Sequence, residues 1–91
     1  MRLRSKIVEI EAEFWEGTFE SARTIEKFVG TTNFFLDSDH PLNVGNLEIW
    51  NKLEDQWIKC PKGHYVLKGL KGEFYPCEPE ALWMKYEVID D

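Results

Sequence analysis

Apolar and acidic residues alternate without interruption from position 8 to position 14, and this pattern constrains the fold more than any other part of the chain. The apolar positions are Val8, Ile10, Ala12 and Phe14, and the acidic positions between them are Glu9, Glu11 and Glu13. Because successive side chains of a strand point to opposite faces, the pattern predicts a strand with one buried and one wet face. We expect Phe14 to be a core residue whose truncation to alanine costs about 3–5 kcal/mol.

The next segment carries the signals of one amphipathic helix. Gly17 interrupts the strand pattern, Thr18 can cap a helix N-terminus, and Gly30 can stop the helix. Between them, one stripe of a helical surface holds the apolar residues Ala22, Ile25, Phe28 and Val29. A helix of about residues 18–29 that packs on the sheet is therefore predicted.

The rest of the chain consists of short strand-like runs separated by turn formers. The runs cover residues 33–37, 47–53, 56–60, 65–68, 73–75 and 85–89, with a loop at 37–45 and a helical turn at 79–83. Pro76 is expected to end the hairpin of 65–75, because proline has no amide hydrogen to donate. The sequence thus predicts a single α+β domain, residues 1–91, with a largely antiparallel sheet and one main helix.

Both ends of the sequence resemble a known group of proteins. The run Tyr65-Val-Leu-Lys-Gly-Leu-Lys-Gly-Glu-Phe-Tyr-Pro-Cys-Glu-Pro79 is similar to the block aromatic-Ile-Ile-Lys-Gly-x-x-Gly-Glu-Phe-Tyr-Pro-Cys-x-Pro of small phage and prophage proteins of unassigned activity. The run Arg4-Ser-Lys-Ile-Val-Glu-Ile-Glu-Ala-Glu-Phe-Trp-Glu-Gly17 resembles the opening of the same group, Arg-Lys-Lys-Pro-Val-Val-Ile-Glu-Ala-x-x-Trp-x-Gly. The group's Gly-Asp-Trp before the final hairpin is replaced here by Gly63-His64-Tyr65. The resemblance implies a phage or prophage origin and assigns no chemistry.

Charge and length narrow the classes of function. The 91 residues carry a net charge of −6, which argues against general nucleic-acid binding. No apolar run is long enough to span a membrane, and we expect a protein of the host bacterial cytoplasm in which Cys60 and Cys77 are free thiols. The basic residues concentrate in two acid-free stretches, 1–8 and 56–72. These are either one anion site or solvated strand edges, depending on whether they meet in space.

Several residue sets have the chemical types of a reactive or metal site without its spacing. Cys60, His64 and Cys77, with His40 as a remote fourth, are zinc-ligand types, but their intervals match no recurring zinc motif. The loop residues Asp37, Asp39 and His40 lack the glycine and distant glutamate of a calcium loop. We therefore expect no metal, no cofactor and no catalytic residues.

The final hairpin and the helical turn after it hold the candidate binding residues. Lys68, Lys71, Tyr75 and His64 offer positive charge and a stacking ring beside two glycines, which suits a nucleotide or another phosphorylated ligand. In the alternative interpretation, the glycines serve the turn and the rings serve the core. Trp83 stands where the resembling proteins tend to carry a charged residue, so we expect it to be exposed and to contact a partner protein.

The leading hypothesis is a noncatalytic phage or prophage accessory protein that acts by binding in the host cytosol, in host takeover or in blunting a defence. Its target is either a host protein or a small phosphorylated ligand that it sequesters. A homo-oligomer suits either target, because pockets often form between small subunits. A small metal-dependent enzyme is the second alternative.

Overall fold

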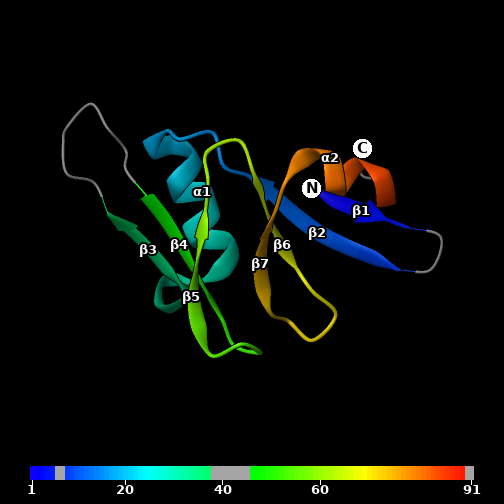
Figure 1. Ribbon diagram of the computed structural model, residues 1–91. Coiled ribbons are helices and arrows are strands. Elements are labelled where there is room, and N and C mark those ends of the chain that lie inside the picture. Colours follow the sequence, from blue (N-terminus) through cyan, green and yellow to red (C-terminus); the bar gives the residue numbers. More distant parts are fainter. Residues whose placement is uncertain (6–7, 38–45, 90–91) are drawn as a thin grey trace.

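The computed structural model describes residues 1–5, 8–37 and 46–89 and shows an α+β fold of two antiparallel sheets and two α-helices (Figure 1). The strands are β1 (Arg2–Arg4), β2 (Glu9–Phe14), β3 (Phe34–Asp37), β4 (Asn46–Asn51), β5 (Gln56–Cys60), β6 (Tyr65–Lys68), β7 (Phe74–Cys77) and β8 (Glu87–Val88). The helices are α1 (Phe19–Val29) and α2 (Pro79–Lys85), with a 3₁₀ turn at Thr31–Asn33. The predicted fold class and main helix are confirmed.

The larger sheet has five strands in the order β7-β6-β2-β1-β8. The alternating segment found in the sequence, β2, lies at its centre and pairs with β1 and β6. Three corrections concern this sheet. The strand β1 was not predicted, although Leu3 within it is fully buried. Pairing continues through Pro76 to Cys77, because β7 is an edge strand and the position of the missing amide needs no partner. The last strand begins only at Glu87, since α2 extends to Lys85.

The smaller sheet has three strands in the order β3-β4-β5, with β4 in the middle. The predicted hairpin of residues 47–60 is confirmed, and Trp50 faces Trp57 across its ladder. Asp55 in the turn has φ 56°, a left-handed conformation that aspartate tolerates better than most residues. The predicted loop at 37–45 lies almost entirely outside the described residues.

Helix α1 forms where the sequence signals place it. The Thr18 hydroxyl accepts a hydrogen bond from the Ser21 amide at 3.0 Å, and Gly30 ends the helix with φ 91°. The apolar stripe of α1 packs into the first core cluster, which also receives residues from both sheets. This cluster consists of Trp15, Ala22, Ile25, Val29, Leu47, Ile49, Cys60, Val66 and Phe74.

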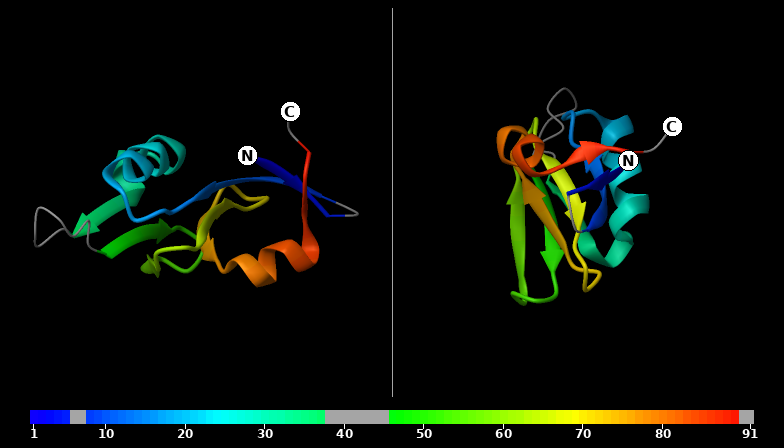
Figure 2. Two further views of the ribbon diagram at one scale, coloured as in Figure 1. Left: turned by 90° about the horizontal axis from the view of Figure 1, so that it is seen from above. Right: turned by 90° about the vertical axis from the view of Figure 1, so that its right-hand side faces the viewer.

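A second core cluster lies on the other face of the larger sheet, under α2. It consists of Leu3, Ile10, Ala12, Leu67 and Leu82, with several tyrosines packed around it. The two helices lie on opposite sides of the molecule and toward its opposite ends (Figure 2). The long axis of the molecule is 42 Å, against 27 and 21 Å for the others.

The interpretation of Phe14 as a core residue was wrong. Phe14 is 39% exposed, whereas the next residue, Trp15, is 1% exposed. Side chains continue to alternate between the two faces of β2, but the face that is buried changes along the strand. Near Ile10 and Ala12 the second cluster covers the apolar face, whereas at Trp15 the first cluster covers the face that carried the glutamates. Phe14 therefore lies at the margin of the second cluster and Trp15 in the centre of the first.

Candidate functional site

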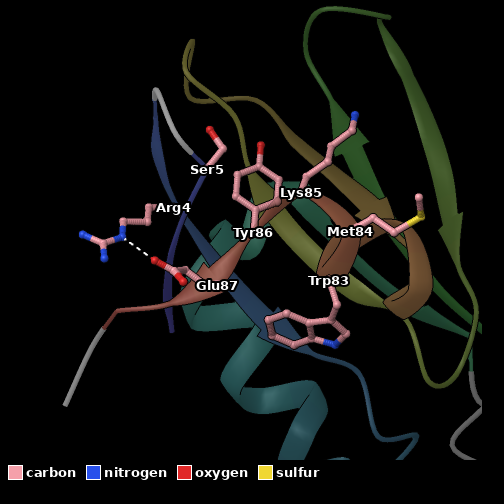
Figure 3. A pocket seen from close by; sticks show the side chains of 7 residues that line it. All are labelled: Arg4, Ser5, Trp83, Met84, Lys85, Tyr86 and Glu87. Atoms are coloured by element: carbon pink, nitrogen blue, oxygen red, sulfur yellow. Dashed lines mark hydrogen bonds and ion pairs between the residues drawn. The ribbon is translucent and has the colours of Figure 1, made fainter.

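A hollow of about 440 Å³ lies where the end of α2 passes over β1, and it contains the exposed tryptophan (Figure 3). Its lining comes from two segments that are remote in the sequence: Arg4 and Ser5 on one side, and Trp83, Met84, Lys85, Tyr86 and Glu87 on the other. The exposure expected for Trp83 is confirmed at 42%, and its neighbour Met84 is 87% exposed. Two large apolar side chains thus stand in water at the surface of one short helix.

The ring of Trp83 packs against the ring of Tyr65 on β6. Its ring meets that of Tyr65 edge to face with centroids 5.6 Å apart, and Tyr65 in turn meets Phe14 at 4.8 Å. An edge-to-face ring pair contributes about 0.5–1.5 kcal/mol beyond the area that it buries, so the contact favours this orientation of the Trp83 ring. A side chain that is already ordered loses less entropy when a partner binds.

Charged groups border the hollow. The Arg4 Nε donates to Glu87 Oε1 at 2.8 Å, and this ion pair ties β1 to β8 (Figure 3). Both side chains are largely exposed, at 56% and 66%, so the pair adds little stability. Aromatic, methionine and arginine side chains are enriched at protein interfaces, and charge is usual at their rim. The lining thus combines side-chain types that are enriched at interfaces with three residues of depleted types, Ser5, Lys85 and Glu87.

The residues predicted to hold a phosphorylated ligand are not brought together. In the β6–β7 ladder Lys68 faces Phe74, and Leu67 faces Tyr75, so Lys68 and Tyr75 point to opposite faces of the larger sheet. Tyr75 packs against the second core cluster, and burial, then the nearby Tyr86, raises its pKa. His64 precedes β6, four residues from Lys68, which separates them by roughly 13 Å along the strand.

The turn of this hairpin already contains a carboxylate. Glu73 Oε1 accepts from the Lys71 amide at 3.1 Å, and the Glu73 carbonyl accepts from the Gly69 amide at 2.7 Å. A Cβ atom at Gly69 would collide with this carboxylate, so the glycine permits a close approach by the chain's own acid. The Lys71 amide is thus already bound to the chain's own carboxylate. The ligand role of the Lys71 side chain stays a prediction.

The two basic stretches do come near each other, but acids lie between them. The strands β1 and β6 flank β2, and the register aligns Arg2, Glu11 and Lys68 in one row. Arg2, Lys68 and Gly69 line a shallow hollow of about 290 Å³ together with Glu9 and Glu11. Cross-strand pairs of opposite charge stabilise a sheet, and their carboxylates weaken the field that an anion would experience.

Within the described part of the chain, no three histidine, cysteine or acidic side chains gather as they would around a metal ion. Cys60 belongs to the first core cluster, whereas Cys77 packs against the second. The His64 Nδ1 atom is buried without a hydrogen-bond partner among the described residues. The loop residues Asp39 and His40 lie outside the described residues.

The two thiols differ from reactive cysteines in their ionisation. Burial raises the pKa of Cys60 to about 12. Burial also raises the pKa of Cys77, a shift that the Lys85 ammonium partly opposes. A nucleophilic cysteine needs a lowered pKa, because the thiolate is the reactive form.

This difference predicts slow alkylation of the native protein. At pH 8 only about one Cys60 side chain in 10⁴ would be a thiolate, so iodoacetamide should modify it at least about 100-fold more slowly than in the denatured chain. Cys77 is half-buried and should react first. Intact mass spectrometry during labelling should show one adduct early and a second only after denaturation. Equal rates for both thiols in the native protein would contradict the burial of Cys60.

Sequence reasoning missed two features of the smaller sheet. One is Asn51, 4% exposed, whose amide donates to the Phe74 carbonyl at 2.9 Å and joins the two sheets. The other is the ring group Phe35, Trp50 and Trp57 on one face of that sheet. The available signal was the equal distance of Trp50 and Trp57 from the centre of the 51–56 turn, which pairs them once the hairpin register is known.

No protein family model, no curated protein and no solved structure matches this chain. None of the helices that the structure describes is long and apolar enough to cross a lipid bilayer.

Proposed function

We propose that the protein is a noncatalytic, phage- or prophage-encoded accessory protein that binds a host protein in the bacterial cytoplasm, in host takeover or in blunting a defence system. The origin rests on the resemblance of both chain ends to the phage and prophage group. The mode of action rests on one observation: Trp83 is held by Tyr65 and is 42% exposed at the border of a 440 Å³ hollow. Tryptophan is a frequent energetic centre of protein interfaces.

The ionisation of the two cysteines argues against their use as nucleophiles. The pKa values of both thiols are raised, which is the opposite of nucleophile activation. Sequestration of a phosphorylated ligand by Lys68, Lys71, Tyr75 and His64 has less support. Lys68 and Tyr75 point to opposite faces of the larger sheet, and carboxylates stand beside the lysines. A host protein is therefore the partner that we propose.

The test is quantitative co-purification of the tagged protein from host cells. The unaltered chain should retain one host polypeptide in a fixed ratio, and Trp83→Ala should reduce the retained amount by at least about tenfold, because truncating an interface centre costs about 2 kcal/mol or more. Met84→Ala should give a smaller loss in the same direction.

Trp57→Ala is the matched control, since Trp57 is 43% exposed on the other sheet and does not line the hollow. Thermal unfolding must first show that both variants fold. Equal retention by Trp83→Ala and the unaltered chain would exclude the hollow as the contact site. If Trp57→Ala lost the host polypeptide and Trp83→Ala retained it, the contact site would lie on the smaller sheet.

A further inference from the structure

One face of the smaller sheet carries exposed aromatic side chains. Phe35 and Trp57 are 48% and 43% exposed, and their ring centroids lie 6.3 Å apart. Trp50 meets Trp57 at 5.6 Å. Helix α1 lies over the opposite face, where Leu47, Ile49 and Cys60 are buried (Figure 2). We call the surface of Phe35, Glu48, Trp50, Trp57 and Lys59 the open face.

We propose that the open face is the interface of a homodimer and that its occupant is a second copy of this chain. Glu48 faces Lys59, and two residues further along Trp50 faces Trp57. Both pairs point to the open face, because residues two apart on a strand share a face.

Two copies can pack with their open faces together, related by a two-fold axis that lies between the two sheets. If this axis runs parallel to the strands and above the line midway between β4 and β5, the two faces are complementary. The rotation exchanges the positions of the two strands without changing height along them. Glu48 of one copy then faces Lys59 of the other, and the same contact occurs a second time by symmetry. Trp50 likewise faces the second copy's Trp57, so the rings fill the space between two sheets packed at about 10 Å.

The charges favour this occupant over a neutral surface. Although Glu48 and Lys59 are cross-strand neighbours, no ion pair joins them in the described part of the chain. An axis placed over β4 would oppose the two copies of Glu48, and an axis over β5 would oppose the two copies of Lys59, so both placements are disfavoured. The pairing of Glu48 with Lys59 beside the paired tryptophans therefore makes the β4–β5 part of this face complementary to its own copy, whereas Asp37, on the same face of β3, lies outside the overlap.

The dimer should be weak. With this axis only β4 and β5 lie over the second copy. Two strands of about five residues cover roughly 10 by 17 Å, or about 170 Å² of sheet plane, compared with about 800 Å² per partner in a standard interface. We expect half-association at roughly 10–100 μM, driven by the rings and oriented by the charges. Sedimentation velocity over about three decades of concentration around that range should show a monomer–dimer equilibrium.

Charge reversal supplies the decisive test. Lys59→Glu and Glu48→Lys should each weaken self-association at least about tenfold, because each places like charges opposite one another. A mixture of the two variants should associate as the unaltered chain does, since each then meets its complement. An effect confined to folding of the monomer cannot be repaired by mixing, and thermal unfolding of each variant alone measures that effect separately.

Two further variants separate this interface from the Trp83 hollow. Trp57→Ala should abolish dimerisation and keep the host partner, whereas Trp83→Ala should keep dimerisation. A chain that stays monomeric through the highest concentration would overturn the proposal. So would a dimer that is insensitive to Lys59→Glu, or single variants that fail to associate when mixed.

Discussion

Trp15→Ala should destabilise the protein more than any other single truncation, by about 3–5 kcal/mol. The indole is the largest fully buried side chain, and it packs with residues of α1 and of both sheets in the first core cluster. Its backbone also joins two segments, because its amide donates to the His64 carbonyl at 2.9 Å and its carbonyl accepts from Gly63 at 2.8 Å. The backbone bonds survive the substitution, so the loss measures the packing of the ring.

A domain of this size has a free energy of unfolding of roughly 5–14 kcal/mol, so this one change removes a large part of it. Thermal unfolding followed by circular dichroism should show a fall in Tm of at least about 12 °C. Phe14→Ala is the matched control: it removes a neighbouring ring that is 39% exposed and should cost about 1–2 kcal/mol. If Phe14→Ala proved the more destabilising, the assignment of Trp15 to the core would be wrong.

Asn51→Ala should lower the free energy of unfolding by about 2–4 kcal/mol, the second-largest effect, although it removes few atoms. The side chain satisfies three backbone groups. Its Nδ2 donates to the Phe74 carbonyl at 2.9 Å, and its Oδ1 accepts from Leu53 and Glu54 at 3.0 and 2.9 Å. The first bond joins the smaller sheet to the larger one, and the other two shape the β4–β5 turn. Alanine leaves all three groups without this partner.

Asn51→Asp separates the two roles. Aspartate keeps the acceptors for the turn, but when ionised it has no donor for the Phe74 carbonyl and adds a buried charge. Burial disfavours the charged form, so the folded-state pKa of this carboxyl should be raised. A group with a raised folded-state pKa stabilises the fold at pH values below its pKa in the unfolded chain, and this stabilisation is lost as pH rises through its pKa in the folded chain. The free energy of unfolding of Asn51→Asp should therefore be closer to that of the parent near about pH 4 than at pH 7.

Denaturant unfolding at both pH values checks this prediction. Asn46→Ala, in the same strand but exposed, is the control and should change stability by less than about 0.5 kcal/mol. Equal stability of Asn51→Ala and the parent would mean that water replaces all three hydrogen bonds, and that Asn51 does not hold the sheets together.

The sequence predicts well those elements whose signals are local. Strand β2 follows from its alternation, and α1 from the Thr18 cap, the apolar stripe and Gly30, because each signal acts within a few residues. The division into two sheets depends on long-range pairings, such as those of β2 with β6 and of β1 with β8. For the same reason the pattern of residues 8–15 could not show that the buried face changes between Phe14 and Trp15.

The candidate site was predictable to a lesser degree. The exposure of Trp83 was expected, but the hollow beside it requires β1, whose three residues are too few for a strand to be recognised from their alternation. The grouping of Lys68 with Tyr75 failed because neighbours in sequence were assumed to share a surface. The hairpin register, which is set by the Gly69–Gly72 turn, places them on opposite faces.

Native mass spectrometry of the protein purified gently from host cells, compared with its mass after denaturation, tests the proposed function most directly. We predict complexes in which the chain, alone or as a dimer, carries a host polypeptide in fixed ratio, with no small molecule released on denaturation. Trp83→Ala should be observed without the host polypeptide, at the mass of the variant chain alone or as its dimer. A small phosphorylated molecule released intact, or bound zinc, in place of the polypeptide would contradict the account and favour sequestration or a metal-dependent activity.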